Sequence, residues 1–374
     1  MTDSLVELEA GAPAPAPVER LRGVEPLSFT GTGGEYFRIW IVNAVLTILT
    51  LGVYSAWAKV RRLQFFYRHT RLAGCGFDYH GDPIAILKGR LVGLALFVAY
   101  SMAGYAEPIV ALAIFALIGL LLPWLLSRSL RFRFRNSSYR GLRFRFTGST
   151  GGAYVVFLAW PILTLISFGL LGPLWHAKIK RYQHAHAAFG ATPFEYDVTD
   201  AEFYLIYVAA AALFLGLTFL TLFVAVGIAA LLSMGASAEA TGPGDPGGFA
   251  ALAVAAFVFI AYAAIFTAMQ SIVAARVLNL VWSKTRIAGH AFLLQLSVPR
   301  LFFIRYTNLL GTLATFGLYR PFAQVRLMRY VTAEFSLLPN PALATLDAFA
   351  AADDGDVGAL GEEAAELFDI DIAF

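Results

Sequence analysis

The sequence predicts an α-helical polytopic membrane protein, on the evidence of its composition, its long apolar runs and a motif that recurs three times. Hydrophobic residues make up 59% of the 374 residues and charged residues only 14%. Soluble domains are usually about 45–50% apolar and about 25% charged. A chain this apolar could not cover its own core with polar surface in water, so we expect it to lie in a bilayer.

Four apolar runs are long enough to cross a membrane, because a helix that spans the hydrocarbon needs about 20 apolar residues. The segments that join the first run to the second, and the third to the fourth, contain no Lys or Arg. By the positive-inside rule these joints face away from the cytoplasm, so the runs predict two helical hairpins of one orientation. The four predicted spans cover residues 84–104, 108–127, 203–233 and 249–275.

Three further apolar stretches share a motif, and they begin at Phe29, Phe146 and Tyr306. Each copy contains a glycine, then a short turn with an aromatic residue in two of the copies, then a basic cluster. The candidate residues of this repeat-turn motif are Gly52, Tyr54, Trp57, Lys59 and Arg61 in the first copy, Gly169, Lys178 and Lys180 in the second, and Gly317, Tyr319, Phe322 and Arg326 in the third.

The basic cluster at the end of each copy belongs on the cytoplasmic side, which is also where each copy begins. A re-entrant element that enters the membrane, reverses at the glycine and returns would satisfy both ends. Irregular backbone at that depth must then be buried against protein or water. Three tilted single spans that obey the charge rule only loosely remain the alternative.

These elements predict two parallel halves, each a re-entrant element followed by a helical hairpin, and a fifth, terminal element. The halves cover residues 27–141 and 142–288, and the terminal half-repeat covers 289–340. Short alternating segments between them predict small cytoplasmic β-hairpins. Residues 1–26 are expected to be a disordered leader and residues 341–374 an acidic disordered tail.

The stretch LRFRFRNSSYRGLRFRF at 130–146 predicts one such β-hairpin, because alternation places Phe on one face and Arg on the other. At a cytoplasmic interface each basic residue close to anionic lipid contributes about 1 kcal/mol. We therefore expect contact with anionic phospholipid and none with nucleic acid. The plainer alternative is a strand pair whose charges only orient the protein. The arginines of this predicted lipid-facing hairpin are Arg131, Arg133, Arg135, Arg143 and Arg145.

The acidic tail raises the question of a partner within the chain. Residues 343–374 hold nine acidic residues and no Lys or Arg, which leaves the preceding part of the chain basic. The stretch EEAAELFDIDIAF mixes acids with apolar residues, so the tail could fold back on that basic part as a latch. A solvated disordered tail is the simpler interpretation.

Catalytic chemistry has little support in the sequence. His176, His184 and His186 lie close in the chain, but residues two apart on a helix do not share a face. Cys75 is the single cysteine, so neither an intramolecular disulfide nor a cysteine cluster can form. We expect no enzyme activity, no catalytic residue, no cofactor and no metal.

The run LGVYSAWAKVR from Leu51, the TRLAG step from Thr70 and the run FDYHG from Phe77 together resemble the YjgN-like family of bacterial inner-membrane proteins. The resemblance covers most of residues 27–340. It implies a multi-pass location in the inner membrane but no activity and no site residues, because the family is uncharacterised. The second motif copy departs from the pattern, with His176 in the place of Trp57.

Two classes of function follow, of which the sequence favours the first and leaves the second as the alternative. The first is a transporter or channel-like protein for a small or lipid-linked solute, which the repeats and glycine-broken helices suggest. The second is a non-catalytic scaffold or anionic-lipid-binding protein with a basic cytoplasmic face. A continuous polar cavity would favour the first, and a plugged interior beside a basic groove would favour the second. Both place the two termini in the cytoplasm, with the membrane, anionic phospholipid and a second copy of the chain (a homo-oligomer) as candidate partners.

Overall fold

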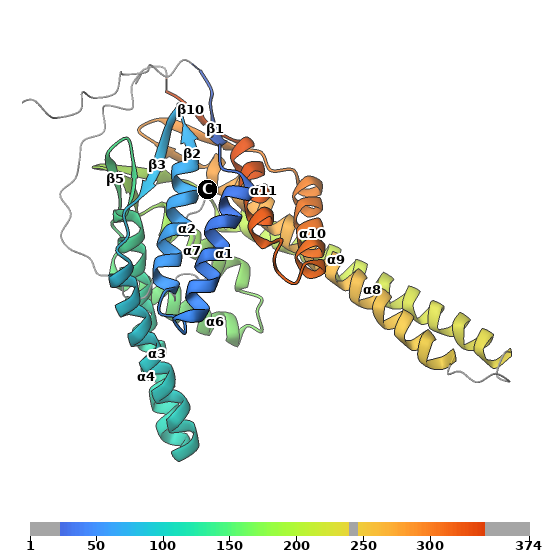
Figure 1. Cartoon of the computed structure of the whole chain (residues 1–374). Helices are drawn as coiled ribbons and strands as arrows, with labels where there is room; N and C mark the ends of the chain where they lie inside the picture. The colour runs from blue at the N-terminus through green and yellow to red at the C-terminus, as the bar shows by residue number, and fades with distance from the viewer. Residues whose placement is uncertain (1–22, 239–245, 341–374) are drawn as a thin grey trace, which may run out of the picture.

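The computed structural model describes residues 23–238 and 246–340, drawn as a ribbon in Figure 1. The strands are β1 (Glu25–Phe29), β2 (Thr70–Leu72), β3 (Cys75–Tyr79), β4 (Ser137–Tyr139), β5 (Leu142–Phe146), β6 (Ala187–Phe189), β7 (Thr192–Tyr196), β8 (Thr285–Ile287), β9 (His290–Leu294) and β10 (Phe335–Leu338). The helices are α1 (Gly33–Leu49), α2 (Ser55–His69), α3 (Pro83–Ala106), α4 (Pro108–Arg135), α5 (Thr150–Tyr154), the π-helix η1 (Val155–Ala159), α6 (Trp160–Ile166), α7 (Gly172–His184), α8 (Asp200–Ala238), α9 (Pro246–Ser283), α10 (Val298–Ala314) and α11 (Arg320–Ala333). The predicted tail 341–374, and the predicted leader 1–26 up to residue 22, lie outside the described residues.

The described strands close into one barrel, in which each strand pairs antiparallel with two neighbours. β1 pairs with β2 on one side and with β10 on the other, so the first and last strands complete the ring. The expectation of an α-helical protein with small separate β-hairpins is therefore wrong. Strands of three to five residues are too short to be stable as isolated hairpins, and only the closed ring satisfies both edges of each strand.

Five units of the same element order build this barrel. Each unit runs from a five-residue strand through two helical arms to a strand of three or four residues. In place of the expected two parallel halves with a terminal element, the structure has these five units. Each first helix follows a Ser, Thr or Asp that lies three residues beyond the end of the strand, and in the first three units the side chain of this residue accepts from backbone N–H groups of the first helical turn. These residues are Thr32, Asp82, Ser149, Thr199 and Ser297.

Antiparallel pairing sends all five helical hairpins out of one end of the barrel, which we call the helical rim. Two-residue turns join consecutive units at the opposite end. At Ala73 and Gly74 both residues have positive φ, +46° and +75°, as in a type I′ turn, whose twist matches that of the strands. The same pair of angles recurs at Arg140–Gly141 and at Ala288–Gly289.

The prediction of four membrane-spanning helices is confirmed in length and composition. The helices long and apolar enough to cross a membrane are the second and fourth hairpins, α3–α4 and α8–α9. Figure 1 shows both hairpins extending well beyond the rest of the described chain. Many of their large apolar side chains are exposed. The first, third and fifth hairpins are short, so we refer to long hairpins and short hairpins below.

The first helical arm of the third hairpin has a physical reason for its π-helical segment. The Trp160 N–H donates to the Val155 carbonyl, five residues back. Pro161 has no N–H to offer the next carbonyl, that of Val156, in the same register. The indole N–H of Trp175 on α7 donates to the Val156 carbonyl instead, at 2.9 Å, which ties the two arms of the hairpin together.

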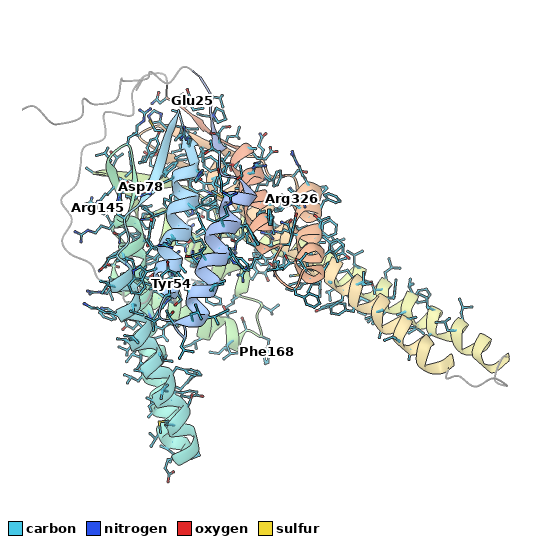
Figure 2. The ribbon with its side chains drawn as sticks, in the orientation of Figure 1. Glu25, Tyr54, Asp78, Arg145, Phe168 and Arg326 are labelled. Atoms are coloured by element: carbon cyan, nitrogen blue, oxygen red, sulfur yellow. The ribbon has the colours of Figure 1, made fainter. Side chains whose placement is uncertain are left out.

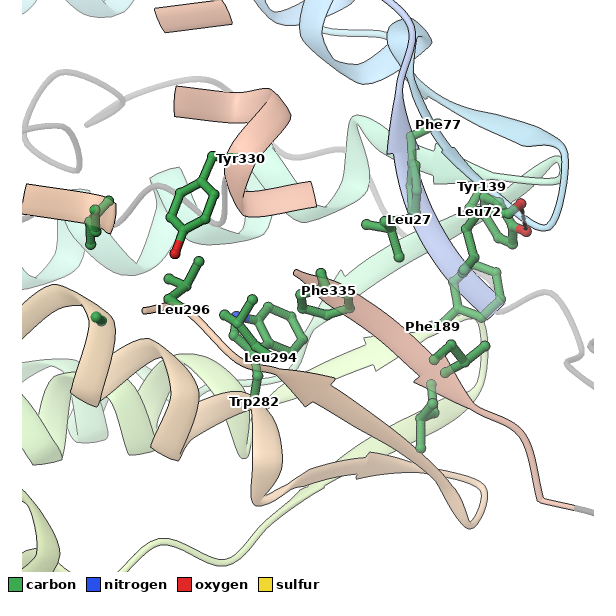
Figure 3. Packing of buried hydrophobic residues seen from close by; sticks show 14 of the residues in the cluster. Leu27, Leu72, Phe77, Tyr139, Phe189, Trp282, Leu294, Leu296, Tyr330 and Phe335 are labelled. Carbon is green, nitrogen blue, oxygen red and sulfur yellow. Dashed lines mark hydrogen bonds between the residues drawn. The ribbon is translucent and has the colours of Figure 1, made fainter. Parts of the chain in front are cut away.

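Large apolar side chains fill the barrel, as the close view in Figure 3 shows. Alternation points the third residue of every strand inward, so each unit contributes two residues to one layer. An apolar cavity of about 90 Å³ remains between them. The inward residues are Leu27, Leu72, Phe77, Tyr139, Phe144, Phe189, Phe194, Ile287, Phe292 and Leu337.

Candidate functional site

A cavity of about 430 Å³, which we call the central cavity, lies at the helical rim. Its walls come mainly from α2, α7, α9, α10 and α11, and Phe77 lines both this cavity and the barrel interior. The long helix α9 contributes Ala274, Val277 and Leu278, which lie toward the barrel end of its membrane span. The cavity therefore lies where one of the helices long enough to cross a membrane leaves the barrel.

Basic side chains from three helices line the central cavity: Arg62 of α2, Lys180 of α7 and Arg305 of α10. Its described lining contains no Asp or Glu. His176 adds no charge at neutral pH, because burial, together with the Lys180 charge, lowers the pKa of its imidazole to about 3. The His176 Nδ1 atom lies 2.6 Å from the hydroxyl of Tyr207. The cavity is thus a positively charged space with partly apolar walls.

A second space of about 400 Å³ lies between α1, α2 and α3, and we call it the lateral pocket. Lys59, Arg62 and Arg90 line it, again with no Asp or Glu in the described lining. Lys59 is only 5% exposed. Arg90 donates to the hydroxyl of Ser55, which fixes α3 against the start of α2. Arg62 lines both spaces, so the central cavity and the lateral pocket share one cation.

The glycine of the repeat-turn motif forms a tight reversal in each short hairpin. Gly52 has a φ of +93°, and its N–H donates to the Thr47 carbonyl at 2.8 Å. Leu51 before it also has a positive φ, +50°. Left-handed backbone costs a residue with a Cβ about 1–2 kcal/mol, which glycine avoids. The same pair of angles recurs at Phe168–Gly169 and at Phe316–Gly317.

The aromatic residues of the motif pack together at the start of α2 in the first copy and at the start of α11 in the third copy. The rings of Tyr54 and Trp57 stack with centroids 6.1 Å apart, and those of Tyr319 and Phe322 do so at 6.0 Å. The guanidinium of Arg61 lies 5.6 Å from the centroid of the Tyr54 ring. Because these contacts are local to the hairpin, they account for the aromatic residues without a ligand.

The basic residues of the motif other than Arg61 fall into two groups. Lys178 pairs with Asp200 at the start of α8 at 2.5 Å, and Arg326 donates to the side chain of Asn308 at 3.2 Å, so both hold neighbouring helices together. The other group lines the two basic spaces. Its members are Lys59 and Lys180.

The predicted arginine hairpin is wrong in its first arm, because α4 continues as a helix to Arg135. Only the second arm is a strand, β5, and it pairs with the short strand β4. Residues two apart on a helix face opposite sides, and the end of α4 is wedged between two groups of neighbours. Phe132 packs with α2 and α3, whereas Phe134 packs with the third hairpin. The five arginines therefore do not share one surface. Arg131, Arg133 and Arg135 lie on α4, and Arg143 and Arg145 lie on the outer face of β5.

Three of the basic residues that line the central cavity and the lateral pocket were not among the sequence candidates. They are Arg62, Arg90 and Arg305. For Arg62 a signal existed, since Lys59 and Arg62 are three residues apart and so share a face of α2. Arg90 interrupts the predicted apolar run 84–104, and Arg305 directly precedes the apolar stretch that begins at Tyr306. A basic residue within or beside such a run is costly unless it has a role. That placement was the signal available for them.

Comparison with known proteins gives relatives that are named as inner-membrane proteins. The chain is 30% identical over 142 residues to a protein of Salmonella typhimurium named Inner membrane protein YjgN, and 32% identical over 142 residues to the protein of that name from Escherichia coli K12. Each alignment covers 38% of this chain and 36% of the relative, so the match spans about a third of those proteins. No solved structure matches the chain.

The family comparison covers far more of the sequence. Residues 24–367 match the model of a family described as bacterial protein of unknown function (DUF898), and this range includes the whole barrel and every helical hairpin. The chain with this five-unit barrel and its basic rim is a member of that family.

Proposed function

We propose that this protein is a multi-pass inner-membrane protein that binds an anionic phospholipid by its headgroup and catalyses no reaction. The observation that carries the proposal is the pair of basic spaces among the hairpin helices, the central cavity and the lateral pocket. Five cations converge there with no Asp or Glu in the described lining. Charge-assisted hydrogen bonds from Arg and Lys to a phosphate are about twice as strong as neutral ones, so a phosphate is the natural ligand.

The proposed membrane arrangement follows from the hairpins. The two long hairpins cross the bilayer, and the barrel with both described chain ends lies on the cytoplasmic side. Each short hairpin ends in a large apolar side chain that is almost completely exposed: Leu51 (95%), Phe168 (97%) and Phe316 (98%). Figure 2 shows Phe168 pointing away from the body of the protein. Burying such side chains in lipid contributes about 1.5–3 kcal/mol each, which outweighs the backbone cost at these positions.

Transport of a small or lipid-linked solute is the second candidate function, since helical hairpins surround a polar cavity. The barrel argues for lipid binding instead. Its inward layer of ten apolar residues fills the axis below the central cavity. A polar solute moving along that axis would have to cross an apolar core without hydrogen-bond partners, which is costly.

Removal of two central cations tests the proposal. In the variant Lys180→Gln/Arg305→Gln, purified in a mild detergent, we expect severalfold less acidic phospholipid by mass spectrometry than in the unchanged protein. The matched control is Arg143→Gln/Arg145→Gln, which removes the same charge from the outer face of β5 and should leave retention unchanged. Equal retention in the cavity variant and the control, with both folded, would refute headgroup binding in the central cavity.

A further inference from the structure

We propose that the acidic segment at residues 343–374 of this same chain binds in the two basic spaces and competes there with the lipid headgroup. This inference rests on the proposed function for the site but names a different ligand for it. The segment contains nine acidic residues and no Lys or Arg. The spaces present Lys59, Arg62, Arg90, Lys180 and Arg305. The charges of ligand and site are therefore complementary.

The apolar residues of the segment match the cavity as well as its acids do. In EEAAELFDIDIAF, residues 362–374, acids alternate with Leu, Phe and Ile. The walls of the central cavity between its cations are apolar, including Leu63, Phe66, Leu301 and Met328. A segment that only needed to stay solvated would gain nothing from these apolar side chains. Binding in a space with charged groups on apolar walls uses both kinds of residue.

The connection to the barrel gives the segment enough length. The described chain ends at residue 340, just after β10, whose end lies at the rim opposite the helices. The first acid of the stretch 362–374 follows 22 residues later, and 22 residues span up to about 70 Å when extended. A barrel strand of five residues is about 17 Å long. The acidic stretch can therefore pass along the outside of the barrel and reach the helical rim.

Tethering makes such competition effective even for a weak contact. A short flexible linker holds its ligand at an effective concentration of about 1 mM. A segment that binds with a dissociation constant of about 0.2 mM would then occupy the site most of the time. Lipid would bind about sixfold more weakly than to a chain without the segment. Anything that withdrew the segment would raise the affinity for lipid.

A peptide experiment separates this inference from the proposed function. We would delete residues 343–374 and measure binding of a fluorescent peptide of residues 356–374 by anisotropy. We expect salt-sensitive binding to the deleted protein, and about sixfold weaker binding to the full chain, whose own segment occupies the site. The control peptide carries Asn and Gln in place of every Asp and Glu and should not bind. In the deleted protein, Arg62→Gln/Lys180→Gln/Arg305→Gln should abolish peptide binding.

The second measurement is lipid retention by the deleted protein, which we expect to rise severalfold over that of the full chain. No peptide binding, equal binding to the triple variant, or unchanged lipid retention after deletion would overturn the inference. Peptide binding at the cations in a protein that retains no acidic lipid, with or without the segment, would overturn competition and the proposed function together. Lipid retention that depends on Lys180 and Arg305 without peptide binding would leave the proposed function intact and overturn the inference alone.

Discussion

The long and the short hairpins leave the same barrel by the same route but are built on different principles. In the long hairpins apolar residues surround both helices and few side chains are buried, so lipid must cover them. The short hairpins bury polar groups such as Asn43 and Asn308 and reverse at a glycine with positive φ. The barrel therefore does not set the depth of a hairpin. The hairpin sequence sets it, and the barrel holds five of them in a ring.

The largest expected effect separates the barrel from a hairpin tip within one unit. Phe189→Ala removes a side chain that is 6% exposed and whose ring centroid lies 4.9 Å from that of Phe144. We therefore expect a loss of about 3–5 kcal/mol in the free energy of unfolding. Phe168→Ala removes one that is 97% exposed and should change stability in detergent little. Equal losses of thermal stability in the two purified variants would mean that the barrel is not the core of the protein.

The next effect separates a short hairpin from a long one. Gly52→Val places a β-branched residue at a φ of +93°, which should cost about 1–3 kcal/mol, although a Cβ there meets no atom within 4 Å. Gly119→Val on α4 also meets no atom, and it replaces glycine in an ordinary helix. We expect a clear fall in melting temperature for the first variant only. Similar melting temperatures would contradict a strained reversal at Gly52.

A smaller effect should appear as the pH falls. Burial, together with the Lys180 charge, lowers the pKa of His176 and of His184 to about 3, whereas an unfolded histidine has a pKa of about 6.5. Between pH 6.5 and 3 the unfolded chain binds the extra protons, so these residues lower stability as the pH falls through that window. His176→Gln/His184→Gln should flatten the dependence of melting temperature on pH between 7 and 4.5. An unchanged slope would show that neither imidazole is held neutral.

The spans could be predicted because they depend on local composition alone, and the helices that can cross a membrane contain the four predicted runs. The barrel could not, because its pairing joins residues far apart, as between Pro26 and Ser336. Repeated short motifs in the sequence do mark some of its strands. TRLAG and TRIAG contain the last strand of the first and fourth units and the turn that follows it. FDY and FEY end the first strand of the second and fourth units.

The arginine stretch shows a second limit of sequence patterns. Alternation of Phe and Arg normally indicates a strand, but a helix end wedged between two neighbours buries opposite sides and gives the same pattern. The central cavity itself could not be predicted for a related reason. Arg62, Lys180 and Arg305 come from three units, and only the ring of hairpins brings them together. No spacing within one segment predicts that meeting.

The closure of the barrel between its first and last strands is the central claim, and a disulfide tests it most directly. Pro26 and Ser336 are register partners on β1 and β10 and lie on the outward positions of those strands. With Cys75 replaced by Ser, the double variant Pro26→Cys/Ser336→Cys should form an intramolecular disulfide in high yield under mild oxidation in membranes. The control Pro26→Cys/Arg143→Cys, which pairs β1 with a strand elsewhere on the ring, should not. No disulfide in the first pair, or equal yields in both, would contradict a closed barrel of five units.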